Sequence, residues 1–572
     1  MGTRPISNDE SQLRNLRKLY GDANASNIAE RLAGLLKKYD DVADVDANEC
    51  HLSQSDVLLI TYGDTLTEPG TPPLQVLKRF HEKYLRDTFN LVHVLPFHPY
   101  SSDDGFSVVD YFSVREDLGS WQDVESLADE CGVMADAVIN HMSSQSDWFS
   151  AFLANDPEYA EFFVECEPDE DLSSVVRPRT TPLLTRFEDS QGRSRYVWTT
   201  FSADQIDLNF RNPEVLVAVM DVLFFLIAKG ARLLRLDAVT FLWKEPGTSS
   251  ANLPQTHALI KIMRRAISSL RDDVVVITET NVPHRENIAY FGSGYDEAQM
   301  VYNFALPPLL AYSFISGDSK HLSHWASQLS VPSEEVCFLN FSASHDGVGV
   351  RPVEEILGEG ELQLLVRAAV NAKGLVSSRT LSGGEERPYE LNCTFLDLIS
   401  RAGEETSTTI ARFVASQAVV LAMPGVPAIY IQSLLGTRND LDRVSQTGRA
   451  RSINRSQHAY SAVKDKLAAE ESLESRVFSG ISDLISVRRE HAAFDPYSPS
   501  RVLDLGPKVF AIQRGRSDYG ATISCIVNLT DERISIDISK NVAGIDLLTN
   551  TRIGQGGHTL PPYAIRWLSA EQ

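Results

Sequence analysis

The sequence predicts an α/β fold, a (β/α)8 TIM barrel with inserted small domains and a C-terminal β-domain. Short apolar runs alternate with helical patterns from about residue 57 to about residue 440, an arrangement that buries a parallel sheet under helices. Eight such runs can be counted, which is the strand number of this barrel. After about residue 493 the pattern becomes alternating and β-rich, which indicates a separate C-terminal domain.

The predicted barrel strands are short runs rich in Val, Ile, Leu and Phe. Before the fourth strand, Asn212 is a good N-cap, Pro213 suits a first helical turn and Gly230 ends the apolar stretch, so we expect a helix there. A second helix is expected from its cap Ser120 to a stop at Gly132. The predicted strands are residues 57–62, 91–97, 133–139, 231–236, 274–278, 300–304, 337–341 and 428–431.

Two segments between predicted barrel strands, 142–211 and 348–410, are too long to be structureless loops in a compact barrel, so we expect a small inserted domain in each. The second contains the Gly-rich stretch 382–387, which we expect to be a mobile loop near the barrel mouth. Strands of the C-terminal domain are expected at 509–513, 523–527 and 533–537. The predicted division is 1–141 (first part of the barrel), 142–211 (inserted domain B), 212–347 (barrel), 348–410 (inserted domain B'), 411–492 (end of the barrel) and 493–572 (C-terminal β-domain).

Charge and hydropathy exclude several classes of function. The chain carries 53 basic and 77 acidic side chains, a formal charge of −24, and such a surface repels nucleic acid and anionic lipid. The longest apolar run, 215–228, is interrupted by Asp221 and is shorter than the ~20 residues that span a bilayer. We therefore expect neither a nucleic acid nor a membrane as partner.

The cysteines and the start of the chain indicate a reducing compartment. The six cysteines are spread singly, which argues against a disulfide framework or a zinc module, and the histidines show no metal-ligand spacing. The start MGTRPISNDE lacks the apolar stretch of a signal peptide. We therefore expect a cytoplasmic protein without a metal or cofactor. The cysteines are Cys50, Cys131, Cys166, Cys337, Cys393 and Cys525.

Acidic side chains stand at the C-terminal ends of three predicted strands, where barrels of this type carry their active sites. Asp237 ends the fourth, Glu279 the fifth and Asp346 the seventh. Each alone could cap a helix or be solvated, but three at one rim are hard to explain as three caps. Packing carboxylates together raises their mutual repulsion, a cost tolerated where one acid must be ionised and another protonated. Glycoside cleavage needs such a pair.

Four short motifs follow one another in a particular order. They are Asp136-Ala-Val-Ile-Asn140-His141, Arg235-Leu-Asp237-Ala, Glu279 after a β-run, and His345-Asp346. In order and spacing they resemble the signatures of the α-amylase family, glycoside hydrolase family thirteen.

Longer stretches narrow this resemblance. Residues 95–107, 140–143, 243–249, 424–430 and 452–455 are similar to the sucrose phosphorylase subfamily. Within it, residues 237–241 and 277–284 look more like the glucosylglycerate phosphorylase branch. Sucrose phosphorylases usually carry Tyr where Phe241 stands and His where Asn281 stands.

The resemblance implies roles for the three carboxylates. Asp237 would be the nucleophile that forms a β-glucosyl ester, Glu279 the general acid and base, and Asp346 the group that holds sugar hydroxyls and stabilises the transition state. A retaining double displacement needs nucleophile and acid ~5–5.5 Å apart, which neighbouring barrel strands can supply. Arg235 lies two residues before Asp237 on the same face of its strand, so we expect it to keep that carboxylate ionised.

The same resemblance implies a glucose pocket. Asp104 and Arg455 are expected to pair at its blind end with charge-assisted hydrogen bonds. For His141 the alternative is a structural histidine that donates to a backbone carbonyl. The other implied pocket residues are Phe106, His345 and Arg235, and on the acceptor side Trp198 and Gln205.

A phosphorylase must bind phosphate, so cations are needed on the acceptor side. The stretch Arg177-Pro-Arg179 offers them, and Arg179 looks like the phosphate-binding arginine of the subfamily. The alternative for Arg179 is a solvated surface arginine beside a turn-forming proline. Arg387 and Tyr389 are a second candidate pair, similar to a mobile loop that alternates between acceptor and phosphate.

These observations predict a retaining phosphorylase that transfers an α-glucosyl group from a small glucoside, with glucosylglycerate favoured, to inorganic phosphate. Phosphate is a co-substrate, and we expect a monomer or homodimer. The alternatives are the same chemistry on glucosylglycerol, sucrose or sucrose 6'-phosphate, or simple hydrolysis. A non-catalytic barrel subunit is the alternative from another class, but such relatives tend to lose the acids that Asp237, Glu279 and Asp346 supply.

Overall fold

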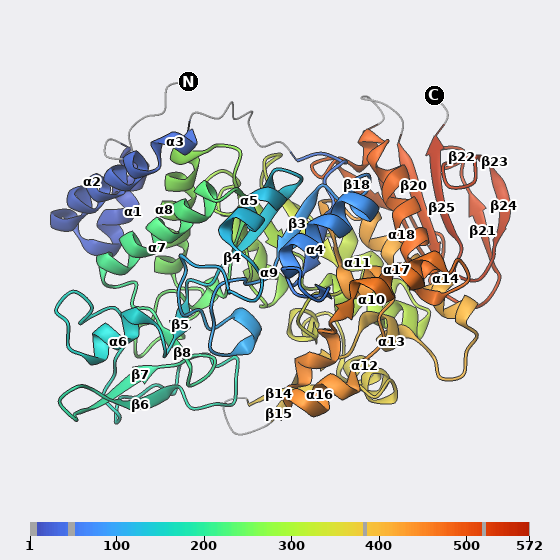
Figure 1. The fold of residues 1–572 in the computed structure, drawn as a ribbon. Helices are drawn as coiled ribbons and strands as arrows, with labels where there is room; N and C mark the ends of the chain where they lie inside the picture. The colour runs from blue at the N-terminus through green and yellow to red at the C-terminus, as the bar shows by residue number, and fades with distance from the viewer. Residues whose placement is uncertain (1–8, 44–51, 381–385, 517–521, 571–572) are drawn as a thin grey trace.

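The computed structural model describes residues 9–43, 52–380, 386–516 and 522–570. Eight parallel strands close a barrel in the order β1-β16-β12-β11-β10-β9-β4-β3 (Figure 1). Every one of them overlaps a run that the sequence predicts to be a strand, although β4 and β16 begin one and two residues earlier than predicted, so the predicted barrel is confirmed. The strands are β1 (Leu58–Thr61), β3 (Leu91–Val94), β4 (Gly132–Ala137), β9 (Ala231–Leu236), β10 (Val275–Thr278), β11 (Met300–Tyr302), β12 (Cys337–Phe341) and β16 (Val426–Tyr430).

Helices cover the outside of the barrel, and the two expected from caps are present. The Asn212 side chain accepts a hydrogen bond from the N–H of Glu214 at the start of α7, and Ser120 and Asp123 form a capping box on α5. Helix α5 ends at Ala128, earlier than predicted, and a short turn leads into β4. The main barrel helices are α4 (Pro73–Phe80), α5 (Trp121–Ala128), α7 (Pro213–Ala228), α8 (Pro254–Leu270), α10 (Leu306–Ser316), α14 (Thr406–Ala422) and α18 (Leu473–Arg489).

The N-terminal segment, predicted as part of the barrel, forms additional helices outside it: α1 (Glu10–Tyr20), α2 (Asp22–Lys38) and α3 (Asp40–Ala43). Helix α1 packs on α8 and α2 on α7, at one side of the barrel (Figure 1). Their buried apolar residues, among them Leu16 and Leu32, recur at helical spacing. Within the predicted division 1–141, residues 10–43 thus precede the first barrel strand as helices packed on its outside.

The first inserted segment lies beyond the C-terminal ends of β4 and β9 and has a small core of its own. Strands β5 and β8 pair antiparallel, with His141 opposite Asp207, and so do β6 and β7. Trp198 lies at the centre of the apolar cluster, together with Val164, Val175 and Leu183. The elements are β5 (His141–Ser143), α6 (Asp147–Leu153), β6 (Leu184–Glu188), β7 (Ser194–Trp198) and β8 (Gln205–Asp207).

The second inserted segment contains a three-stranded sheet in the order β13-β15-β14. The Gly-rich stretch predicted as a mobile loop lies outside the described residues, apart from Glu386 and Arg387, which begin β15. Helix α14 begins at Thr406, ahead of the predicted boundary at 410. The elements are β13 (Val348–Gly349), α12 (Glu359–Asn371), β14 (Leu375–Thr380), β15 (Glu386–Asn392) and α13 (Phe395–Ile399); the short helices α16 (Leu441–Thr447) and η7 (Ala450–Asn454) follow β16.

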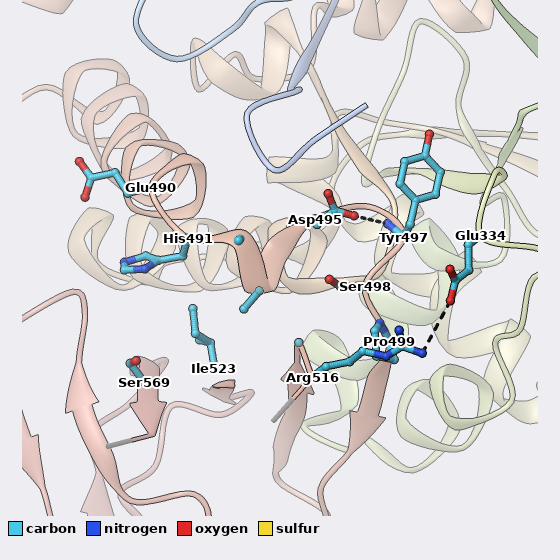
Figure 2. A pocket seen from close by; sticks show the side chains of 13 residues that line it. Glu334, Glu490, His491, Asp495, Tyr497, Ser498, Pro499, Arg516, Ile523 and Ser569 are labelled. Atoms are coloured by element: carbon cyan, nitrogen blue, oxygen red, sulfur yellow. Dashed lines mark hydrogen bonds and ion pairs between the residues drawn. The ribbon is translucent and has the colours of Figure 1, made fainter. Parts of the chain in front are cut away.

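The C-terminal residues form a β-domain beside the barrel, as predicted (Figure 1). A cavity of ≈ 550 Å³ lies between the end of α18 and this domain, with His491, Asp495 and Arg516 among its lining residues (Figure 2). In the described part of the chain no helix has the length and apolarity to cross a membrane. The strands are β18 (Ser500–Val502), β19 (Val509–Arg514), β20 (Ile523–Asn528), β21 (Ile534–Ile538), β22 (Gly544–Asp546), β23 (Thr551–Ile553), β24 (Gly556–Leu560) and β25 (Ile565–Ala570).

Candidate active site

Asp237 and Glu279 stand level with each other at the C-terminal rim of the barrel. The register pairs Leu236 of β9 with Thr278 of β10, and each carboxylate residue comes directly after its partnered position. Neighbouring strands run ~4.7–4.9 Å apart, a spacing compatible with the ~5–5.5 Å that a retaining mechanism needs between its two carboxyls. The Glu279 Oε2 accepts a 3.1 Å hydrogen bond from the N–H of Ala238. Ala238 has a φ of 51°, an uncommon conformation for alanine.

The Arg235 side chain contacts two carboxylates, those of Asp237 and Asp136. Its Nη1 donates to Asp237 Oδ1 at 2.7 Å and also to the carboxylate of Asp136. His93 Nε2 lies 2.7 Å from Asp136 Oδ2. Burial raises the pKa of Asp136, but Arg235 and His93 outweigh burial and bring it down to about 2. Asp136 is thus held ionised and in turn anchors Arg235.

The three rim carboxyls have pKa values that are driven apart. Burial, followed by the charges of Asp237 and Asp346, raises the pKa of Glu279 to about 7, although Arg235 opposes the shift. Burial also raises the pKa of Asp237. Arg235 opposes this shift by its charge and its hydrogen bond, so it favours the ionised form of Asp237, the effect that we expect of it. Glu279, with a pKa of about 7, is therefore a rim carboxyl that can exchange a proton near neutral pH.

Asp346, after β12, is held by a cation that sequence reasoning missed. The Arg451 Nη1 lies 2.5 Å from Asp346 Oδ1, and its Nη2 lies 2.9 Å from Glu390 Oε1. Burial alone would raise the pKa of Asp346, but Arg451, His345 and Arg455 hold it well below its ordinary value. In the sequence, Arg451 directly precedes the stretch 452–455, which resembles the sucrose phosphorylase subfamily. Its position next to that motif is the signal that could have identified it as a site residue.

The predicted pair of Asp104 and Arg455 is formed. The Arg455 Nη1 lies 2.5 Å from Asp104 Oδ2, and its Nε donates to the carbonyl of His345 at 2.8 Å. Arg449, which we did not predict, also bonds Asp104, at 2.9 Å. The rings of Phe106 and His345 stack with centroids 4.9 Å apart and an interplanar angle of 7°. These residues build a rigid wall facing the rim carboxylates.

His141 makes the backbone contact that was its structural alternative, with Nε2 2.8 Å from the carbonyl oxygen of Phe106. It also lies near enough to Asp237 to lower that carboxyl's pKa. Gln205 Nε2 donates to the same carbonyl at 3.0 Å, so Gln205 lies beside His141. Trp198 is fully buried in the core of the first inserted segment. It presents no surface to a solvent-accessible site, so its placement on the acceptor side was wrong.

The structure brings Arg179 and Tyr389 together. The Arg179 Cζ lies 5.7 Å from the centre of the Tyr389 ring, a cation–π distance. Asn281 Nδ2 approaches the Tyr389 hydroxyl at 3.5 Å, which connects this group to the loop after Glu279. Arg387 is exposed, two residues before Tyr389 on β15. In the described part of the chain, Nε and Nη2 of Arg177 have no hydrogen-bond partner.

The arrangement suits a double displacement on a glycosidic bond. A carboxyl with a pKa of about 7 can donate and recover a proton at neutral pH, and the carboxylate on the neighbouring strand can attack. Within the described ranges, no cluster of three or more His, Cys, Asp and Glu side chains could hold a metal ion. None of the rim carboxylates lines the large cavity of Figure 2.

Comparisons with known proteins agree with the geometry. The model of the α-amylase catalytic domain matches residues 83–333. Glucosylglycerate phosphorylase from Escherichia coli (strain K12) is 43% identical over 518 residues, 91% of this chain and 92% of that one. The enzyme of the same name from Allomeiothermus silvanus is 41% identical over 562 residues, 98% of each chain.

More distant similarities extend over most of the chain. Sucrose phosphorylase from Agrobacterium vitis is 32% identical over 477 residues, 77% of this chain and 89% of that one. Among solved structures, sucrose 6F-phosphate phosphorylase from Thermoanaerobacter thermosaccharolyticum superposes with a TM-score of 0.74 at 23% identity, covering 88% of this chain and 98% of that one. That likeness concerns the fold.

Proposed function

The chain belongs to the α-amylase family and, within it, to the glucosylglycerate phosphorylases, and on that premise we propose that it transfers an α-glucosyl group from 2-O-α-glucosylglycerate to inorganic phosphate. The products are α-glucose 1-phosphate and glycerate. The observation that carries the chemistry is the pair at the ends of β9 and β10: Glu279, with a pKa of about 7, level with Asp237.

In the first step a carboxylate oxygen of Asp237 attacks the anomeric carbon. The bond from that carbon to the glycerate oxygen breaks, and Glu279 gives its proton to this oxygen, so glycerate leaves as an alcohol. The Ala238 N–H holds the Glu279 carboxyl in place, and the negative charge of Asp346, which stays ionised, stabilises the positive charge that develops on the sugar ring. A β-glucosyl ester of Asp237 remains.

In the second step a phosphate oxygen attacks the same carbon from the face that glycerate left. The bond to Asp237 breaks, and Glu279 takes a proton from the incoming hydrogen phosphate, which returns both acids to their starting states. Two inversions give net retention, so the product is the α-anomer.

The acceptor side has to bind two anions in turn, the carboxylate of glycerate and then phosphate. Arg179 beside Tyr389, with Arg387 on the same strand as Tyr389, supplies the cations for both. Asn281, in the loop after β10, lies within reach of the Tyr389 hydroxyl. Position 281 is one at which the sequence resembles the glucosylglycerate phosphorylase branch, so a branch-specific residue contacts the proposed anion-binding group. Glucose recognition falls to Asp104, Phe106, His141, His345 and Arg455.

The proposal also covers the cofactor, the cellular compartment and the oligomeric state. The reaction needs phosphate as co-substrate and no further cofactor. The spread of single cysteines suits a reducing cytoplasm, and the charge of −24 suits a protein that does not bind polyanions. We expect a monomer or homodimer.

One assay tests the proposal. The purified enzyme is incubated with phosphate and, separately, glucosylglycerate, glucosylglycerol, sucrose and sucrose 6'-phosphate, and glucose 1-phosphate and free glucose are both measured. We expect glucose 1-phosphate mainly from glucosylglycerate. Faster release from another donor would reassign the acceptor, and free glucose as the main product would make the enzyme a hydrolase.

A further inference from the structure

Lys244 is a buried cation in a cage of oxygen atoms beside the site, in the stretch 243–249 that the mechanism above does not use. Its Nζ lies 2.7 Å from Asn140 Oδ1, 3.3 Å from the Asn140 carbonyl, 3.5 Å from the Leu208 carbonyl and 3.7 Å from Asp207 Oδ2. The cage thus joins the end of β4, the first inserted segment and the loop after β9. Burial lowers the pKa of Lys244 to about 8 and Asp207 opposes the shift, so the ammonium form predominates at pH 7.

The ammonium fixes which way the Asn140 amide points. An ammonium group can only donate, so the amide atom 2.7 Å away has to be the oxygen. The amide nitrogen then faces the other way, 3.3 Å from Asp207 Oδ1 and 3.1 Å from His141 Nδ1. A carboxylate oxygen accepts, so the Asp207 contact agrees with this orientation.

The amide in turn fixes the tautomer of His141. An amide nitrogen can only donate, so His141 Nδ1 accepts and carries no hydrogen. At the other end of the ring, Nε2 is 2.8 Å from the Phe106 carbonyl oxygen, which can only accept, so Nε2 carries the hydrogen. Both contacts therefore favour the same form. The Gln205 Nε2 lies 3.2 Å from His141 Nε2 but has the Phe106 carbonyl and Asp103 Oδ2 as acceptors for its own hydrogens.

We propose that Lys244 is a positioning residue for His141: its ammonium orients the Asn140 amide, and that amide holds the imidazole in the Nε2–H form that donates to the Phe106 carbonyl. Only the expected effect on the KM for the glucosyl donor rests on the proposed function. The chain of contacts from Lys244 to His141 does not.

The test is Lys244→Met, which keeps the length of the side chain and removes its donors. With 15N-labelled histidine, and His141→Gln to assign the signal, the wild type should show an unprotonated Nδ1 and a protonated Nε2. In Lys244→Met the two nitrogen signals should move toward each other, because the amide is free to turn over and both tautomers form. The KM for the glucosyl donor should rise about tenfold, with a smaller change in kcat. Glu245→Gln, a charge change at the next position, should alter neither signal.

Asn140→Asp is the second variant, which keeps Lys244 and covers the case in which Lys244→Met does not fold. Its carboxylate can accept from His141 Nδ1–H, so Nδ1 should become protonated. Unchanged tautomer signals in Lys244→Met, even with reduced activity, would overturn the proposal, because Lys244 would then only support the scaffold. If Lys244→Met does not fold, unchanged signals in Asn140→Asp would overturn it. Shifted signals in an enzyme that releases no glucose 1-phosphate from any donor would leave this inference standing and remove the proposed function.

Discussion

The Oε2 of Glu279 lies 3.1 Å from the backbone nitrogen of Ala238, the residue that follows Asp237. This hydrogen bond connects the carboxyl of Glu279 to the main chain directly after Asp237, so it helps to keep the distance between the acid and the nucleophile constant. Because this backbone donor is present whether or not Glu279 is protonated, the separation is kept through both steps.

Asp237→Asn should abolish turnover of every donor, by at least about 1,000-fold, because an amide cannot form the glycosyl ester. The fold should survive, since an amide fills the same space and can still meet Arg235. Release of glucose 1-phosphate and thermal unfolding are measured together, with Asp483→Asn on the exposed face of α18 as the matched control. Activity near the wild-type level would remove Asp237 as nucleophile.

Glu279→Gln should impair natural glucosides far more than α-glucosyl fluoride, because fluoride leaves without being protonated. The comparison is between the losses in kcat/KM on the two donors. If both donors lose activity equally, Glu279 is not the acid.

The pH dependence of the first step follows from the raised pKa of Glu279. The acid has to be protonated, so kcat/KM for glucosylglycerate should fall as the pH rises through about 7. With α-glucosyl fluoride this alkaline decline should be much weaker. The same decline on both donors would show that another group controls it.

The raised pKa also predicts an effect on stability. Folding moves the pKa of Glu279 from its ordinary value near 4.5 up to about 7, so the folded state holds this proton more tightly than the unfolded state. The stabilising contribution is complete below pH 4.5 and is lost as the pH rises through about 7. Glu279→Gln does not titrate, so its Tm relative to wild type should increase between pH 5 and pH 8. A constant difference would mean that the pKa is not raised.

Arg179→Ala should raise the phosphate concentration needed for half-saturation by roughly 30- to 150-fold, the value of a lost charged hydrogen bond of ~2–3 kcal/mol. Water should then compete for the glucosyl ester, so free glucose should increase. Although the protein has a charge of −24, its global field decays over about 8 Å at ~0.15 M salt, whereas a direct contact is hardly screened.

Two variants sharpen this test. Arg367→Ala on α12, an exposed arginine, should leave phosphate use unchanged, and Arg179→Lys should recover only part of it because lysine cannot bind phosphate in a bidentate way. Unchanged saturation in Arg179→Ala would make Arg179 a surface residue and direct attention to Arg387 and Tyr389.

The sequence alone determined the barrel and the rim. Each barrel strand is a short run whose apolar side chains have to be buried, and such runs can be read without knowing their neighbours. Since parallel strands present their C-terminal ends at one face, the positions of Asp237, Glu279 and Asp346 followed from the strand ends. The pairing of Asp104 with Arg455 followed from a family resemblance, although 350 positions of chain separate them.

Only the tertiary structure decided how these groups are surrounded. Arg451 meets Asp346 and Glu390 because three distant segments converge, and no local pattern marks that meeting. Trp198 looks like a site residue in the sequence and lies in a core, because its neighbours Val164 and Leu183 are brought to it by folding. The pKa of Asp237 rises because the closed barrel excludes water, and the water lost by a charge depends on every element around it.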